Sequence, residues 1–142
     1  MFDDSQRGII TQKFFEMIIR EPDNYEIVLS PVLQEEISRT PDPEKKKNIL
    51  ERLQSLPVID VKKNEEAENL AWTYVIEDVL TDNHLDDLRH VAYAVVTHCS
   101  YVVSWNMRHL SNVRTIERVN NYNRINNLSL VIITPPTLFI GE

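Results

Sequence analysis

Two adjacent carboxylates open one of the strongest helical patterns in the chain. Asp86 and Asp87 precede the mostly apolar stretch that runs from Leu88 to Ala94. Shortly afterwards, the apolar segment that begins at Tyr101 turns polar at Ser104, Trp105 and Asn106. Open α/β folds bind ligands where helices begin and strands end, so a carboxylate on a helix beside a polar strand end is a candidate site for chemistry.

Several common kinds of site are excluded by residue type. Gly8 and Gly141 are the only glycines, so neither a P-loop nor a dinucleotide-binding fingerprint can be written in this sequence. The chain has no CxxC or HExxH motif, which disfavours structural and proteolytic zinc sites. Any metal that binds here must therefore be held by oxygen ligands.

The charge is unevenly distributed. The formal net charge is −7, which argues against loose attraction to nucleic acid. Residues 1–88 carry 20 acidic and 10 basic side chains, whereas residues 89–142 carry 2 acidic and 5 basic ones. A local basic surface near the C-terminus therefore remains open.

Length and hydropathy place the chain among soluble, intracellular proteins of one domain. Its 142 residues, 42% of them hydrophobic, suffice for one packed core. The apolar run Leu128–Ile133 is too short to span a membrane, and Met1 to Asp4 lack the basic start of a signal peptide. Cys99, the single cysteine, is expected to be a small buried hydrophobe.

Strand and helix patterns alternate along the chain. Helices are predicted at about 7–20, 31–39, 43–55, 63–80, 84–98 and 112–126. Strands are predicted at 25–30, 57–61, 101–105 and 128–134. This alternation favours a parallel sheet flanked by helices.

Local signals define several of these boundaries. Ser30 is a predicted N-cap with Pro31 in the first helical turn, and Thr40 or Asp42 can cap the next helix. The expected buried face of helix 43–55 is Leu50, Leu53 and Leu56. The expected inner side of helix 63–80 is Ala67, Leu70, Ala71, Tyr74, Val75 and Leu80.

Four ordered motifs together resemble PIN-domain proteins, which include ribonuclease toxins of the VapC type. They are Ser30 with Glu36 and the run Arg39 to Pro43, then Asp87 to Ala92, then Val103 to Asn106 with His109, and then Ile133 to Leu138. The resemblance implies an α/β three-layer sandwich with a mostly parallel PIN-like sheet, formed by a single domain over residues 1–142.

The resemblance also implies a Mg²⁺- or Mn²⁺-dependent ribonuclease. Glu36 and Asp87 match family acids that would act as metal ligands and catalytic residues, and Asn106 stands at the position of a further catalytic acid. Magnesium prefers oxygen ligands and can activate a water while neutralising a phosphodiester. The implied setting is a cytoplasmic toxin-antitoxin homodimer with an RNA substrate, an antitoxin partner and no membrane association.

The sequence departs from the family pattern at two positions. The family begins with a hydrophobic strand ending in aspartate, whereas this chain starts after that point, and Asn106 contributes no charge. We hypothesise that the gene start lies upstream; alternatively, neighbouring strands close up or another chain donates a strand. The alternative function is a catalytically inactive PIN-like module that binds nucleic acid or protein.

Each candidate acid also has a structural interpretation. Glu36 could be a solvated helix residue like Glu35, and Asp87 could favour the first helical turn through the helix dipole. Asp86 could pair with His90 one turn later. Arginines near the C-terminus could contact RNA backbone or form a solvated face: Arg108, Arg114, Arg118 and Arg124.

Overall fold

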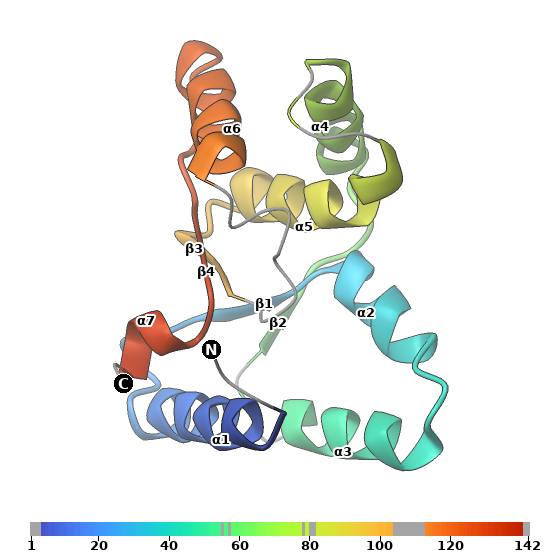
Figure 1. The fold of residues 1–142 in the computed structure, drawn as a ribbon, viewed down its shortest axis with the longest axis vertical. Helices are drawn as coiled ribbons and strands as arrows, with labels where there is room; N and C mark the ends of the chain where they lie inside the picture. Colours follow the sequence, from blue (N-terminus) through green and yellow to red (C-terminus); the bar gives the residue numbers. More distant parts are fainter. Residues whose placement is uncertain are drawn as a thin grey trace. The chain divides into compact units, whose positions relative to one another are not determined.

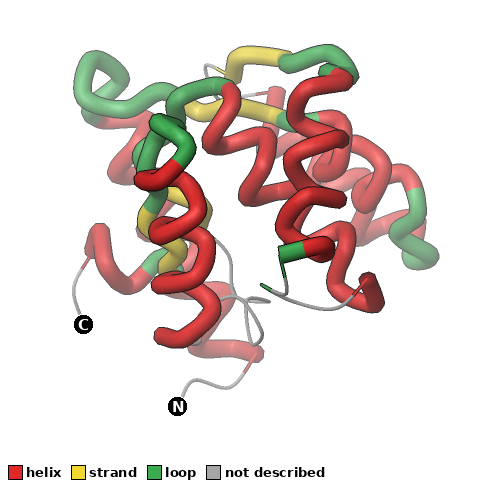
Figure 2. The backbone as a smooth tube through the Cα atoms, turned by 90° about the horizontal axis from the view of Figure 1, so that it is seen from above, coloured by secondary structure: helices red, strands yellow, loops and turns green. Residues whose placement is uncertain are grey.

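The computed structural model describes residues 4–54, 56, 58–77, 79, 82–103 and 113–140. The chain divides into two compact units, Met1–Lys63 and Asn64–Glu142. Each unit combines helices with one pair of short parallel strands, so the mixed α/β class and the parallel pairing are confirmed. Figure 2 shows short strands between much longer helices. The single PIN-like domain over 1–142 stays a prediction.

The first unit contains three helices and two strands (Figure 1). In chain order they are α1 (Asp4–Arg20), β1 (Ile27–Leu29), α2 (Pro31–Ser38), α3 (Pro43–Gln54) and β2 (Val58–Asp60). Strands β1 and β2 pair in parallel, with Ile27 opposite Val58, and the Val61 N–H extends the ladder to the Leu29 carbonyl at 3.0 Å.

The helix boundaries of this unit follow from the predicted caps. The Ser30 hydroxyl accepts a hydrogen bond from the Leu33 N–H at 3.2 Å, and Pro31 is the first residue of α2. Asp42 Oδ1 accepts from the Glu44 N–H at 3.0 Å in front of α3. Both caps satisfy donors that a helix N-terminus otherwise leaves without a partner.

Packing in the first unit differs from the prediction at α3. The buried apolar residues of the unit are Met17, Ile18, Val32, Ile37 and Leu56. Helix α3 buries none of its residues, and Leu50 is 43% exposed. The predicted buried face was therefore wrong for Leu50, because its helix borders an open groove.

The second unit contains α4 (Glu65–Ile76), a 3₁₀ turn (Asp82–His84), α5 (Leu85–Val96) and β3 (Tyr101–Val103). It continues with α6 (Val113–Ile125), β4 (Ile132–Thr134) and α7 (Thr137–Ile140). Helices α4 and α5 pack against each other, and β3 pairs in parallel with β4, with Val102 opposite Ile133.

The core of the second unit is built mainly by α4 and α5. The prediction that Ala67, Leu70, Ala71 and Tyr74 face inward is confirmed. Helix α5 buries Leu88, Val91, Ala92, Tyr93, Ala94 and Val95. Five consecutive residues of this set, from Val91 to Val95, are buried, so all sides of this part of α5 are enclosed by its own unit.

Several details of the second unit differ from the prediction. Helix α4 ends at Ile76, and Val75 is only half-buried, whereas Leu80 lies outside the described residues and its inward position stays a prediction. Cys99 is partly exposed after the end of α5, with its sulfur 3.2 Å from the Thr97 hydroxyl, so its interpretation as a buried hydrophobe was wrong. The short helix α7 was not predicted.

Candidate functional site

Glu36 lies on the exposed side of α2, the helix that directly follows the carboxyl end of β1. The neighbouring Ile37 is buried and anchors the opposite side of the helix in the first unit. The helix therefore presents the Glu36 carboxylate to solvent, as it does that of Glu35, and the role of Glu36 as a metal ligand stays a prediction.

Asp87 lies in the first turn of α5, in the second unit. Its carboxylate oxygen Oδ2 is 4.0 Å from His84 Nδ1, and the two side chains are 31% and 26% exposed. An acidic side chain is favoured at this end of a helix by the positive pole of the helix dipole. Asp87 is thus held between the interior and solvent, beside a histidine.

Asp86 pairs with Arg89, whereas its neighbour Asp87 lies beside His84. Arg89 Nη1 donates to Asp86 Oδ1 at 3.0 Å, while Nε and Nη2 of the same guanidinium donate to the two carboxylate oxygens of Glu68 on α4, at 2.9 and 3.1 Å. The Arg89 side chain is only 12% exposed. Because two hydrogen bonds join it to one carboxylate, this ion pair fixes the orientation of α5 against α4.

Tyr93 extends the same network into the core. Its hydroxyl donates to Glu68 Oε2 at 2.7 Å and accepts from the Asn64 N–H at 3.0 Å. Burial raises the pKa of Tyr93 above its ordinary value, and the hydrogen bond to the Glu68 carboxylate acts in the same direction. We call Asn64, Glu68, Asp86, Arg89 and Tyr93 the α4–α5 network.

The α4–α5 network was missed by sequence reasoning. Glu68 was not among the candidate residues that the sequence suggested. The signal that could have found part of it is the spacing of Asp86 and Arg89, which are three residues apart on a predicted helix and therefore share a face. The pairing with Glu68 links two helices and has no local sequence signal.

The predicted site residues are distributed over both units. Glu36 belongs to the first unit and Asp87 to the second, and Asn106 lies outside the described residues. Among the residues that the structure describes, no group of three or more His, Cys, Asp or Glu side chains could hold a metal ion. The roles of Glu36 and Asp87 as metal ligands stay predictions.

The basic residues that could meet RNA lie mainly on α6. Arg114 and Arg118 are exposed and four residues apart, which places them on one side of the helix. Arg124, near the end of the helix, donates to Asn121 Oδ1 at 3.0 Å. Arg108 lies outside the described residues.

Comparisons of the chain with protein-family profiles, curated proteins and solved structures gave no match. The PIN resemblance therefore rests on the four sequence motifs. In the part of the chain that the structure describes, no helix is both long and apolar enough to cross a membrane.

Proposed function

We propose that this protein is a PIN-type ribonuclease that hydrolyses RNA phosphodiester bonds with the help of Mg²⁺ or Mn²⁺. In this proposal Glu36 and Asp87 bind the cation, and Asn106 acts as an auxiliary group that positions water. The proposed fold is the three-layer PIN-like sandwich that the resemblance implies. A toxin role with an antitoxin partner, a homodimeric state and a cytoplasmic location follow from the same resemblance.

The proposal is carried by the different environments of Asp86 and Asp87. Arg89 engages Asp86 at 3.0 Å, so that acid belongs to the α4–α5 network. Asp87, the residue that the family motif selects, lies next to it with a partly exposed carboxylate facing His84. The network thus holds the helix turn from which Asp87 projects, and groups fixed by such supporting bonds bind ligands with less reorganisation.

In the proposed reaction the acids and the arginines have separate roles. Glu36 and Asp87 supply carboxylate oxygens, which are the donors that Mg²⁺ and Mn²⁺ prefer. A bound divalent cation supplies an activated water and neutralises charge on the phosphate. Arg114 and Arg118 are exposed on one side of α6 and supply positive charge to RNA backbone without reading its sequence.

Matched substitutions of neighbouring acids test this assignment. Asp87→Asn should abolish Mn²⁺-dependent cleavage of a mixed-sequence RNA, whereas Asp86→Asn should retain it, because an asparagine oxygen can still accept from Arg89. In the first unit, Glu36→Gln should likewise abolish cleavage, whereas Glu35→Gln should retain it. Equal cleavage by parent and Asp87→Asn would refute the site, as would no Mn²⁺-dependent cleavage by the parent.

One observation favours a second candidate, a non-catalytic PIN-like module that binds RNA or protein. Within the described residues the acids do not form a three-ligand group, and Arg89 neutralises much of the charge of Glu68 and Asp86. Such a module would bind RNA through Arg114 and Arg118 yet show no saturable Mn²⁺ binding. RNA binding by the parent that is unaffected by Mn²⁺, weakened by Arg118→Gln and accompanied by no cleavage would support it.

A further inference from the structure

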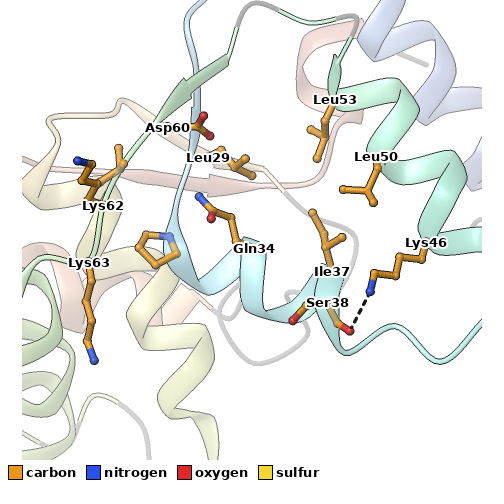
Figure 3. A pocket seen from close by; sticks show the side chains of 12 residues that line it. Leu29, Gln34, Ile37, Ser38, Lys46, Leu50, Leu53, Asp60, Lys62 and Lys63 are labelled. Atoms are coloured by element: carbon orange, nitrogen blue, oxygen red, sulfur yellow. Dashed lines mark hydrogen bonds between the residues drawn. The ribbon is translucent and has the colours of Figure 1, made fainter. Parts of the chain in front are cut away.

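A groove lies within the first unit, between α2, α3 and the ends of the paired strands (Figure 3). Its volume is about 620 Å³. This is within the range of roughly 300–1,000 Å³ that small-molecule sites in proteins occupy. Glu36 does not line the groove, so the groove is separate from the proposed metal-binding residue of this unit.

The walls of the groove are mainly apolar. Ile37 projects from α2 toward Leu50 and Leu53 of α3, and Leu29 closes the end beside the strands (Figure 3). Leu50 remains 43% exposed, so this surface is not covered by the unit itself. Covering it with an apolar group would be favourable at about 25 cal/mol for each Å² removed from water.

The charged residues around these walls are mostly basic. Lys46, Lys62 and Lys63 line the groove, and Asp60 is the one acid among its lining residues. In the described parts of the chain none of the three lysines forms an ion pair with a carboxylate. Among the residues that the structure describes, the ammonium group of Lys46 donates to the Ser38 carbonyl, at 3.4 Å. The groove therefore offers an excess of positive charge beside an apolar surface.

The position of Lys46 on α3 places positive charge next to the apolar surface of the groove. Lys46, Leu50 and Leu53 are separated by four and then three residues, so they form one stripe along the helix that faces the groove. Figure 3 shows the Lys46 side chain directed toward Ser38 at the end of this stripe. An anion at Lys46 would thus lie in line with an apolar body resting on the two leucines.

We infer that this groove binds a small amphipathic carboxylate, a molecule with one anionic head and a linear apolar body. The carboxylate pairs with Lys46, and the apolar body lies between Ile37 of α2 and the leucines of α3. The volume suits a free small molecule, and the positive charge selects an anion over a neutral compound of the same shape.

Decanoate is a suitable probe, with decanol and acetate as ligands that carry only the apolar body or only the charge. Calorimetric titration of the full chain should give saturable binding of decanoate and at least about tenfold weaker binding of either control ligand. Amide chemical shifts should change at α2 and α3 on binding. Binding of decanol as tight as that of decanoate would overturn the role of the lysines.

Two lysines that are adjacent in sequence provide a matched pair of variants. Lys46→Glu should weaken decanoate binding by about tenfold or more, whereas Lys45→Glu makes the same charge change at a residue that does not line the groove and should change it less than about twofold. Leu50→Gln, at an exposed position, should weaken binding without unfolding the unit. Equal effects of the two lysine variants, an absence of saturable binding, or binding only to vesicles of anionic phospholipid would each refute the inference.

Discussion

Helices α3 and α5 are both 12 residues long, yet they take opposite roles in their units. Helix α5 buries six of its residues and forms the centre of the second unit. Helix α3 buries none, and its leucines border a groove. The difference follows from composition, because α5 is apolar from Val91 to its end, whereas α3 carries five charged or amide side chains in a row, from Glu44 to Asn48.

This contrast indicates where each unit can perform a function. Asp87 projects from the end of an enclosed helix that is clamped by Arg89, and such a rigid base suits the fixed geometry of a metal ligand. The groove beside α3 has walls that its own unit leaves exposed, and such walls suit an apolar ligand that completes the packing.

The largest expected effect is a loss of stability that distinguishes the buried helix α5 from the exposed helix α3. Leu88→Ala should destabilise the second unit by about 3 kcal/mol, because Leu88 is fully buried and the substitution leaves a cavity. Leu50→Ala should cost less than about 1 kcal/mol. Amide hydrogen exchange of α5 and α3 measures both effects unit by unit. Similar losses for the two variants would show that α3 is packed as firmly as α5.

The next largest loss of stability should come from breaking the ion pairs that Arg89 of α5 forms with Glu68 and Asp86. Arg89→Met should cost about 2–3 kcal/mol, because Glu68 and Asp86 would lose their partner while remaining close together. Lys47→Met removes an exposed pair with Glu51 on α3 and should cost at most about 0.5 kcal/mol. Urea unfolding followed by circular dichroism measures both changes. A loss from Arg89→Met as small as that from Lys47→Met would mean that the α4–α5 network stabilises little.

A smaller effect depends on pH and belongs to the second unit alone. The buried Tyr74 hydroxyl donates to Asn123 Oδ1 at 2.7 Å, and burial raises the pKa of Tyr74 above its ordinary value of 10.0. Above pH 10 the unfolded chain therefore releases this proton while the folded chain keeps it, so stability falls as pH rises further.

Tyr74→Phe tests this linkage. The substitution should cost about 1–2 kcal/mol at neutral pH by removing the hydrogen bond, and it should flatten the decline above pH 10. Urea unfolding at pH 8 and at about pH 11 gives both quantities. Tyr25→Phe is the control in the first unit. An unchanged slope above pH 10 would exclude Tyr74 as a source of the pH dependence.

The smallest effect should come from backbone conformation. Gly8 lies inside α1, and among the described residues a Cβ added there would contact no other part of the chain beyond its own helix backbone, so Gly8→Ala should stabilise the first unit by about 0.5–1 kcal/mol. In the second unit Asn127 has a φ of 58°, and Asn127→Gly should give a gain of similar size. Thermal unfolding measures both gains. A loss of stability in either variant would contradict the expected effect of backbone conformation at that position.

The elements of the fold were predictable where their signals are local. Ser30, Pro31 and Asp42 act within three residues of themselves, and the helices that they begin were correctly predicted. Four short strands were also located, although β4 covers only Ile132–Thr134 of the predicted 128–134. Strand ends depend on pairing with a distant segment, which a local pattern does not specify.

The asparagine-rich part of α6 shows what local reasoning misses. Asn120 donates to the Val131 carbonyl and accepts from the Val131 N–H, both at 3.0 Å, just before β4 begins. Asn123 is fully buried and accepts a hydrogen bond from the Tyr74 hydroxyl. These asparagines have poor helix propensity, yet their amide groups are used by partners 11 and 49 residues away.

The candidate site was predictable to a similar extent. The helix start that carries Asp87 was correctly located, but the separate partners of Asp86 and Asp87 depend on Glu68 and His84, which only the fold brings near them. Metal binding by Glu36 and Asp87 stays a prediction.

Titration with Mn²⁺ tests the central claim most directly. Calorimetry of the parent chain and of the Glu36→Gln and Asp87→Asn variants measures whether both acids serve one cation. We predict one saturable Mn²⁺ site in the parent, with an affinity at least about tenfold lower in each variant. An unchanged affinity in either variant, or no saturable binding by the parent, would contradict the account.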